Sequence, residues 1–348
     1  MQQTYSLQRL SIDGYEHVYY MLDATVGLEG YIAIHSTKRG PALGGTRLWS
    51  YASKEDALTD VLRLAKGMSY KAAAADLPLG GGKAVLIGNP NTIKSDAYFE
   101  AYGRIIDALK GRYITAKDMN INTDDIQRIA RQTTHVVGRE GKSGNPSPWT
   151  ALGVFHACVA TIREVFPTRE LSSLSFAIQG VGETGFHLIQ QLVAHGVTSI
   201  LISDINPDKL QRVLTQFPFI HVVDDSKLLA AHVDVLCPCA FGGILPHHSL
   251  PSIQAKVIVG SANNVFLDSE HDPQRFHDAG IWVAPDYMAN AGGLINVYYE
   301  LENKHDESFL KTTIQRIADR LTNLYQRVKQ SGINPFTLSL SLTQSFIE

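Results

Sequence analysis

A glycine-rich turn between a strand-like and a helix-like segment constrains the fold of this chain more than any other feature. The sequence GVGETG, residues 180–185, follows the apolar run SFAIQ and precedes a periodic apolar stretch that extends to about His195. In such a turn the first glycine allows the tight bend, the second lets a diphosphate approach the backbone, and the third lets the helix pack on the strand. The free N–H groups of the helix N-terminus then face the diphosphate. The pattern predicts a Rossmann-type domain with a dinucleotide-binding loop that contains Gly180, Gly182, Glu183, Thr184 and Gly185.

Asp204 fits the same interpretation. It comes 19 residues after Gly185, directly after the strand-like run ILIS, where Rossmann domains place an acceptor for the adenosine ribose hydroxyls. No arginine stands at positions 205–207, so a 2′-phosphate would meet negative charge, which favours NAD over NADP. The Glu183 carboxylate would complement the helix dipole but repel a diphosphate, so we expect its side chain to point outward. In the alternative interpretation, the three glycines serve only the packing of a Rossmann-like sheet.

The bulk composition is that of a globular protein with two domains. The chain has 348 residues and a net charge of −3, which gives no basic surface for nucleic acid or an anionic membrane. No apolar run reaches the length of a membrane span, and the N-terminal sequence lacks the pattern of a signal peptide. Three cysteines argue for a reducing compartment, so we expect a cytoplasmic protein. Cys237 and Cys239 are interpreted as core thiols, and no histidine or cysteine spacing predicts a metal site.

A loop rich in Gly, Ser and Pro, predicted at Gly138–Pro148, separates two parts of the chain whose predicted secondary-structure patterns differ. The first part mixes strand patterns with helices, one of which is expected to begin at Ser53. The second part alternates short apolar runs with helical stretches, which indicates a parallel sheet with crossover helices. The predicted fold is therefore α/β in two domains: residues 1–140 form a mixed α/β domain, residues 141–329 form the Rossmann domain, and residues 330–348 pack back on the first domain.

A second unusual segment, KAAAADLPLGGGK, places Lys71 and Lys83 around three consecutive glycines. Glycine runs fit places where the backbone approaches another group closely or takes a positive φ, and we expect a turn there. A lysine fixed after such a turn, with another lysine nearby, suggests one ammonium that binds a carboxylate and one amine that acts as a base near neutral pH. The alternative interpretation is a flexible surface loop with two solvated lysines. A phosphate-binding P-loop is excluded, because Leu77 and Ala84 stand where it requires a glycine and a hydroxyl residue.

Further segments occur along the chain in a recognisable order, namely PALGGTR, RLAKGMSYKAAAADLPLGGGKAVLIG, YITAKDMN, SGNPSPWTALG, PCAFGG, GSANN and APDYMANAGGLINV. Together with GVGETG, these segments resemble the Glu/Leu/Phe/Val dehydrogenases over nearly the whole chain. The resemblance is to the leucine and phenylalanine dehydrogenase branch, with a further likeness to bacterial tryptophan dehydrogenases. It implies a substrate-binding N-terminal domain, an NAD-binding Rossmann domain and an active site in the cleft between them. The implied reaction is the reversible oxidative deamination of an L-amino acid to a 2-oxo acid, ammonia and NADH.

The resemblance also implies roles for individual residues. Lys71 matches the lysine that binds the substrate carboxylate, Lys83 the catalytic lysine that activates the attacking water, and Asp118 the aspartate that exchanges protons with the substrate nitrogen. Taken alone, the residues around Asp118 fit a turn or a helix N-cap instead. Other implied substrate contacts are Gly44, Gly45, Leu43, Met68, Ala116, Asn263, Leu294 and Val297. Other implied cofactor contacts are Thr150, Cys239, Ala240, Asn264 and Asn290.

The implied pocket is apolar, which indicates a hydrophobic substrate rather than glutamate. Leu43 and Ala116 resemble the leucine-type pocket, whereas Asn120 and the segment 242–245 resemble the tryptophan-type enzymes. We expect a leucine-like substrate, with phenylalanine or tryptophan as the alternative. The resemblance further implies a homo-oligomer, a dimer or an octamer, that binds small molecules only.

Two other classes of function remain as alternatives. One is a catalytically silent NAD-binding sensor, which would have no need for all three of Lys71, Lys83 and Asp118. The other is a 2-hydroxy-acid dehydrogenase, which would require a histidine with a carboxylate partner, and the segments that frame the implied cleft contain no such histidine.

Overall fold

The computed structural model describes residues 5–139, 144–240, 242–304 and 306–347. The chain divides into two compact units, here called the N-terminal unit (1–145, 297–305 and 343–348) and the C-terminal unit (146–296 and 306–342). The domain limits given above stay a prediction. Within the predicted loop, residues 140–143 lie outside the described residues. No helix in the described ranges is long and apolar enough to cross a membrane.

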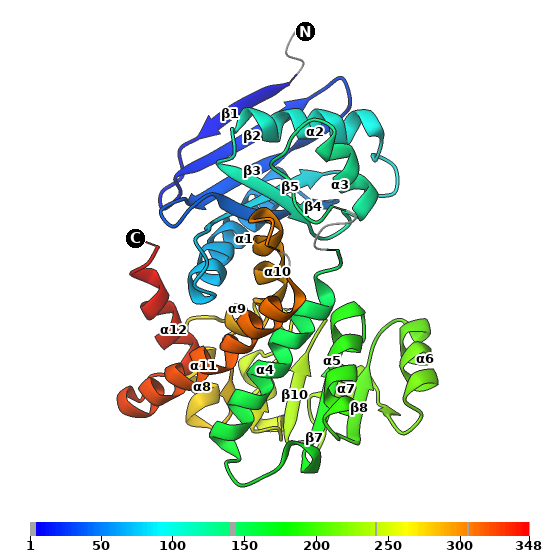
Figure 1. Ribbon diagram of the computed structural model, residues 1–348, viewed down its shortest axis with the longest axis vertical. Coiled ribbons are helices and arrows are strands. Elements are labelled where there is room, and N and C mark those ends of the chain that lie inside the picture. The colour runs from blue at the N-terminus through cyan, green and yellow to red at the C-terminus, as the bar shows by residue number, and fades with distance from the viewer. Residues whose placement is uncertain (1–4, 140–143, 241, 305, 348) are drawn as a thin grey trace. The chain divides into compact units, whose positions relative to one another are not determined.

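The N-terminal unit is built on a six-stranded mixed sheet with the strand order β1-β2-β3-β5-β4-β6 (Figure 1). The strands are β1 (Ser6–Leu10), β2 (His17–Asp23), β3 (Leu28–Ser36), β4 (Ala42–Trp49), β5 (Gly80–Ile87) and β6 (Tyr113–Lys117). The helices are α1 (Lys54–Ala74), α2 (Asp96–Ala108) and α3 (Thr123–Ala130). Strand β4 runs parallel to both of its neighbours, β5 and β6, whereas the other pairs are antiparallel. Lys83 within β5 and Asp118, directly after β6, are thereby brought to the two sides of β4.

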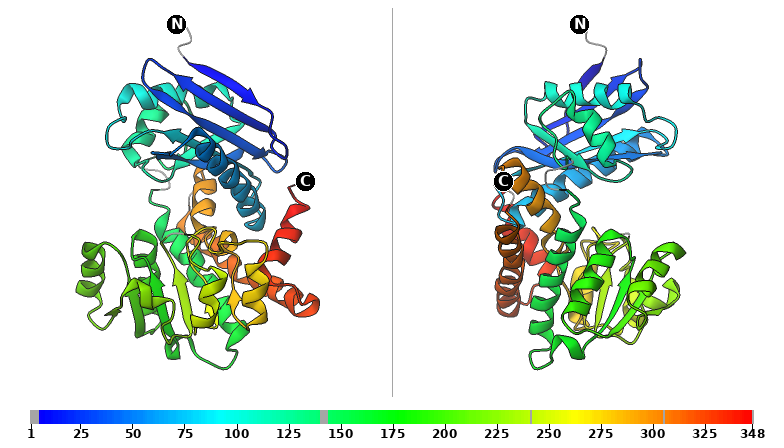
Figure 2. Two further views of the ribbon diagram at one scale, coloured as in Figure 1. Left: turned by 180° about the vertical axis from the view of Figure 1, so that it is seen from behind. Right: turned by 45° about the vertical axis from the view of Figure 1, so that its right-hand side comes forward.

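Helices cover both faces of this sheet. Helices α2 and α3 pack on one face in a core that includes Tyr98, Phe99 and Ile126, and α1 packs on the other through Ala57 and Val61 (Figure 2). Helix α1 begins as predicted, because the Ser53 side chain accepts a hydrogen bond from the Asp56 N–H at 3.0 Å.

The expectation of a turn at the three consecutive glycines is wrong. Gly80, Gly81 and Gly82 are the first residues of β5, and none of them has a positive φ. Glycine is required here because α1 approaches the strand closely: a Cβ at Gly81 would lie 2.1 Å from the backbone nitrogen of Ser69 on α1. The absence of side chains lets α1 lie directly against the strand that carries Lys83.

The C-terminal unit contains a second six-stranded sheet, entirely parallel, with the order β12-β11-β10-β7-β8-β9. Its strands are β7 (Ser175–Gln179), β8 (Ser199–Ser203), β9 (His221–Val222), β10 (Val235–Pro238), β11 (Val257–Ile258) and β12 (Trp282–Val283). The chain starts at the central strand β7 and winds first to one side and then to the other. The glycine loop after β7 therefore lies where the strand order reverses, which is the ligand-binding position of doubly wound sheets.

Helices and short helical turns connect and flank these strands. They are α4 (Ser147–Val165), η1 (Leu171–Ser173), α5 (Glu183–Ala194), α6 (Pro207–Gln216), α7 (Asp225–Leu228), η2 (His247–Ser252), α8 (Asp272–Asp278), α9 (Asp286–Ala289), α10 (Gly292–Leu301), α11 (Glu307–Ser331) and α12 (Pro335–Gln344). Helix α4 begins inside the predicted loop. Pro148 is tolerated there because it occupies the first helical turn, where its missing N–H has no helical partner to lose.

Candidate active site

An ion pair between a buried lysine and a partly exposed aspartate forms the centre of the candidate site in the N-terminal unit. Lys83 lies within β5 and is 6% exposed, and its Nζ is 2.6 Å from Oδ2 of Asp118, which follows the end of β6. Burial raises the pKa of Asp118, but the charges of Lys83 and Arg47 outweigh it and hold the pKa below its usual range. The pair therefore contains an ionised carboxylate within hydrogen-bond distance of the Lys83 Nζ.

Two glycines of β4, the strand between Lys83 and Asp118, make close backbone contacts here. A Cβ at Gly45 would lie 2.8 Å from the Asp118 Cβ, and a Cβ at Gly44 would lie 1.8 Å from the Gly82 carbonyl oxygen. The Tyr113 hydroxyl donates a hydrogen bond of 2.7 Å to the Gly44 carbonyl and fixes the strand from the buried side. Only glycine fits at these two buried positions, because a side chain at either one would collide with the backbone of a neighbouring strand or of Lys117.

The remaining substrate-contact candidates of this unit surround the two glycines. Met68 on α1 has its Cγ 3.4 Å from the Cβ position of Gly44, and Lys71 lies three residues further along the same helix face. Leu43 and Ala116 are buried, and Ala116 stands opposite Gly45 in the sheet register.

Arg47 is a site residue that the sequence interpretation missed. Its guanidinium Nη1 is 2.9 Å from Oδ2 of Asp60, and its Nε is 3.5 Å from Oδ2 of Asp118. The available signal was its place at the end of PALGGTR, two residues after Gly45. That spacing puts it on the same side of the strand as the glycine beside Asp118.

The backbone conformation explains why position 120 is an asparagine, without any contact to a substrate. Its φ is 59°, in the left-handed region where asparagine is one of the few tolerated side chains besides glycine. Its Nδ2 donates to the Leu48 carbonyl at 3.0 Å. An asparagine at position 120 is therefore explained by the backbone conformation alone.

In the C-terminal unit, the glycine loop has the geometry that a dinucleotide requires. Gly180 has a φ of 86° after β7, and a Cβ at Gly185 would lie 2.1 Å from the Gly180 carbonyl oxygen. Gly182, by contrast, has open space, with only the Lys209 Nζ at 3.8 Å from its Cβ position, and as the N-cap of α5 it offers no side-chain cap. Open space beside uncapped helical N–H groups fits a diphosphate.

Asp204 ties this loop to the end of β8. Its Oδ2 accepts the Val181 N–H and its Oδ1 accepts the Asn206 N–H, both at 2.9 Å. The carboxylate is thus held at the edge of the loop, and its oxygens keep further lone pairs for hydroxyl donors.

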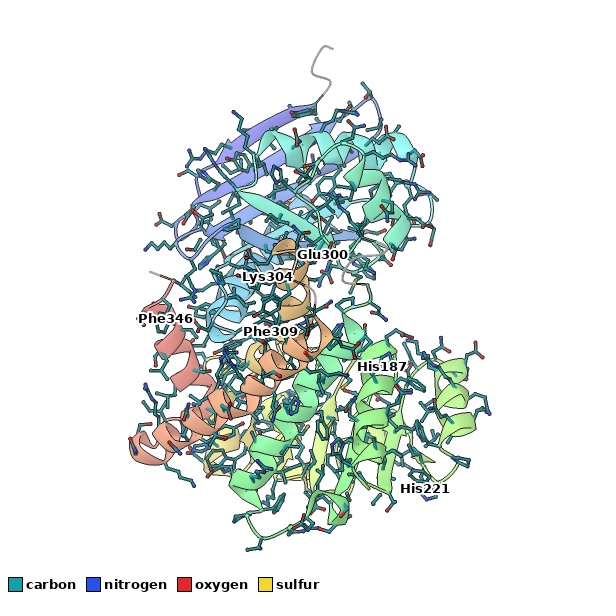
Figure 3. The ribbon with its side chains drawn as sticks, in the orientation of Figure 1. His187, His221, Glu300, Lys304, Phe309 and Phe346 are labelled. Carbon is teal, nitrogen blue, oxygen red and sulfur yellow. The ribbon has the colours of Figure 1, made fainter. Side chains whose placement is uncertain are left out.

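The Glu183 side chain turns to a cation on the next helix. Its Oε1 is 2.6 Å from Nη1 of Arg212 on α6, and its Oε2 is 3.9 Å from the imidazole of His187, labelled in Figure 3. With about half of its side chain exposed, Glu183 is engaged at the surface of the loop, and Arg212 balances its charge.

The other candidates in this unit follow strand ends or lie in helices. Thr150 lies in α4. Cys239 follows β10, where its N–H donates to the Gln179 carbonyl at 2.7 Å, and Ala240 comes next. The Asn290 Nδ2 donates to the Asn263 Oδ1 at 2.8 Å. Other placements are Asn264, with a φ of 54°, and the buried Leu294 of α10. Val297 is also buried in α10 but belongs to the N-terminal unit.

Comparison with known proteins identifies two matching family regions. Residues 18–135 match the family described as Glu/Leu/Phe/Val dehydrogenase, dimerisation domain. Residues 208–337 match the family described as Glutamate/Leucine/Phenylalanine/Valine dehydrogenase. The two regions follow each other along the chain in the order of the two units.

Individual relatives agree with these matches. The chain is 43% identical over 336 residues to a leucine dehydrogenase of Bacillus cereus, covering 96% of this chain and 91% of that protein. It is 41% identical over 320 residues to an L-tryptophan dehydrogenase of Nostoc punctiforme, covering 92% and 90%. The crystal structure of L-tryptophan dehydrogenase from Nostoc punctiforme superposes with a TM-score of 0.81 at 38% identity, covering 96% of each chain.

Proposed function

The chain belongs to the Glu/Leu/Phe/Val dehydrogenase family and is an amino-acid dehydrogenase that acts on a CH–NH2 group, and on that premise we propose that its substrate is a leucine-like L-amino acid. The products are the 2-oxo acid, ammonia and NADH. The observation that supports the chemistry most directly is the ion pair between the buried Lys83 and Asp118, with Gly45 of β4 next to the aspartate.

Each charged residue of the N-terminal unit has a distinct task in this proposal. The Lys71 ammonium binds the substrate carboxylate, and the Gly44–Gly45 backbone lies along the amino acid. Asp118 exchanges protons with the substrate nitrogen and stabilises its cationic form, while Lys83 takes a proton from the water that attacks the imino carbon. The 2.6 Å separation of Lys83 and Asp118 lets a proton pass between the two groups without large motion.

The cofactor proposed is NAD, whose nicotinamide accepts the hydride from the substrate Cα when bound. The loop of Gly180, Gly182, Glu183, Thr184 and Gly185 would hold the diphosphate, and the Asp204 carboxylate would accept hydrogen bonds from the ribose hydroxyls. The space at Gly182 and the uncapped start of α5 support this assignment. Further contacts are proposed from Thr150, Cys239, Ala240, Asn264 and Asn290.

The preference for a hydrophobic side chain follows from the residues proposed to line the pocket. Leu43, Met68, Ala116, Leu294 and Val297 are all apolar, and Asn263 supplies a polar contact. Among nearby cations, the Lys117 Nζ donates to the Thr123 hydroxyl at 3.2 Å rather than serving a second substrate carboxylate. The aliphatic choice rests on Leu43 and Ala116. An aromatic substrate is the alternative, since leucine and tryptophan dehydrogenases are similarly close relatives.

We further propose that the protein is a homo-oligomer, because the region 18–135 matches a family described as a dimerisation domain. A dimer or an octamer fits this description equally. Sedimentation of the purified protein over a range of concentrations distinguishes the two.

A substrate panel tests the proposal. NADH formation is measured at alkaline pH with leucine, valine, phenylalanine, tryptophan and glutamate, and each reaction is repeated with NADP. We expect leucine and valine to react fastest and NADP to be poor. Faster turnover of phenylalanine or tryptophan would refute the aliphatic assignment. Some turnover of several substrates is expected, since one methylene in an apolar pocket changes the selectivity by only about 1–3 kcal/mol. No turnover on any of the five would contradict the proposed reaction.

A further inference from the structure

Arg47 lies between two carboxylates of the N-terminal unit. Its Nη1 donates to Asp60 at 2.9 Å, and its Nε lies 3.5 Å from Oδ2 of Asp118. The side chain is only 20% exposed, and Nε is buried without an aligned hydrogen-bond partner among the described residues. The hydrogen bond to Asp60 therefore fixes the guanidinium at Nη1, and its Nε faces Asp118.

Arg47 is held in place by Asp60, which lies in α1. Asp60 is 13% exposed, and its Oδ2 also accepts the Tyr51 hydroxyl at 2.7 Å. The Arg63 guanidinium lies 3.5 Å from the other oxygen of Asp60. These contacts hold Asp60 as a rigid carboxylate behind Arg47, which limits the directions in which the guanidinium can move.

Asp118 faces cations from two strands. Lys83 comes from β5 and Arg47 from β4, whereas its chain neighbour Lys117 is engaged with Thr123. In the proposed reaction Lys83 gives up its proton during part of the cycle. An arginine stays protonated at any working pH, so Arg47 is then the cation that remains beside Asp118.

We propose that Arg47 is a positioning residue that acts through Asp118, keeping this carboxylate ionised and oriented while Lys83 is neutral. The inference rests on the proposed function and adds to it a residue outside the substrate and cofactor contacts. Without the guanidinium, the Lys83–Asp118 pair would take up a proton at a higher pH.

The test compares the pH dependence of kcat/KM in three variants. Arg47→Met should move the acid limb of the profile, the pH range in which kcat/KM falls on acidification, to higher pH by about 1–3 units. This is the range by which an adjacent cation shifts the pKa of a carboxyl group. It should leave the Kd for NAD within about twofold, and Arg47→Lys should return the limb towards wild type. Arg39→Met is the matched control, since the Arg39 side chain is similarly buried, with 22% of it exposed, and pairs with Asp76 at 3.0 Å in the same unit. It should not move the limb.

A second variant should shift the acid limb in the opposite direction. Asp60→Asn removes the competing carboxylate but keeps both charges of the Arg47–Asp118 contact, so the acid limb should move to lower pH. This variant keeps the proposal testable if Arg47→Met does not fold. Loss of activity in both variants with unchanged pH profiles would assign Arg47 and Asp60 a structural role only and overturn the proposal, as would an equal shift in Arg39→Met.

A readout without turnover separates this inference from the reaction itself. The 13C carboxyl signal of Asp118, assigned by its loss in Asp118→Asn, should titrate at higher pH in Arg47→Met than in the wild type. That result would support the effect of Arg47 on Asp118 even if the substrate panel refuted the proposed reaction. An unchanged Asp118 titration would overturn the inference even in an active enzyme.

Discussion

The Glu183 carboxylate, at the first position of α5, lies 2.6 Å from the guanidinium of Arg212 on α6. The guanidinium carbon of Arg212 also lies 3.8 Å from the centroid of the Phe186 ring, an arrangement that favours the cation further. A negative side chain beside the proposed diphosphate site is therefore compensated by a cation 29 residues along the chain.

The first prediction concerns this compensation. Arg212→Ala should raise the KM for NAD by about three- to tenfold, because a released Glu183 carboxylate repels the diphosphate within a Debye length of about 8–10 Å. The double variant Glu183→Ala/Arg212→Ala should recover the wild-type KM. Initial rates at low and high salt measure the effect, which should shrink as the salt concentration rises. A double variant as impaired as Arg212→Ala would mean that Arg212 acts on NAD independently of Glu183.

Two glycines of the same loop should respond differently to alanine. Gly182→Ala should fold with nearly wild-type stability, because its Cβ meets only open space, but it should bind NAD at least about tenfold more weakly. Gly185→Ala should lose stability as well, since its Cβ would lie 2.1 Å from the Gly180 carbonyl. Thermal unfolding and NAD titration of both variants distinguish these outcomes. Normal NAD binding by Gly182→Ala would argue against a diphosphate at this position.

Lys83→Ala should lower kcat by about 10²–10⁴-fold, the range for loss of a general base, while the Kd for NAD changes little. Fluorescence titration with NAD and steady-state rates provide the two numbers. Lys94→Ala is the matched control, because Lys94 pairs with the fully buried Asp125 in the same unit and should affect stability rather than turnover. Equal loss of NAD binding and turnover in Lys83→Ala would indicate a disrupted fold instead of a lost base.

His35 should make the protein sensitive to mild acid. Burial and the charge of Lys66 lower the pKa of His35 from 6.5 to about 4, and its Nδ1 lies 2.8 Å from the Ser69 hydroxyl. Between about pH 6.5 and pH 4, His35 therefore binds a proton in the unfolded chain but not in the folded protein. The free energy of unfolding falls as the pH is lowered through this window. The loss is on the order of 2 kcal/mol between pH 7 and pH 4.5.

Urea unfolding at several pH values tests this assignment. His35→Gln should lose less stability than the wild type over the same pH range, although it can start from a lower value at pH 7. His221→Gln, at the exposed His221 of β9 (Figure 3), should follow the wild-type curve. Parallel curves for the wild type and His35→Gln would show that His35 is not the group responsible.

The sequence by itself determined the family, the α/β class and the Rossmann character of the second half. These features depend on short-range signals: the glycine turn after an apolar run, the carboxylate after the next strand, and the Ser53 N-cap three residues before Asp56. Each can be read locally, because helix capping and tight turns depend on neighbouring residues.

The tertiary structure decided the local features of the site in the N-terminal unit. Local propensity predicts a turn at Gly80–Gly82, but the glycines form a strand because α1 packs where their side chains would be. The contacts among Arg47, Lys83 and Asp118 join residues distant in sequence, and they exist because β4 lies between β5 and β6. Strand order is set by the packing of the whole sheet, and no periodicity within a single segment reports which strands become neighbours.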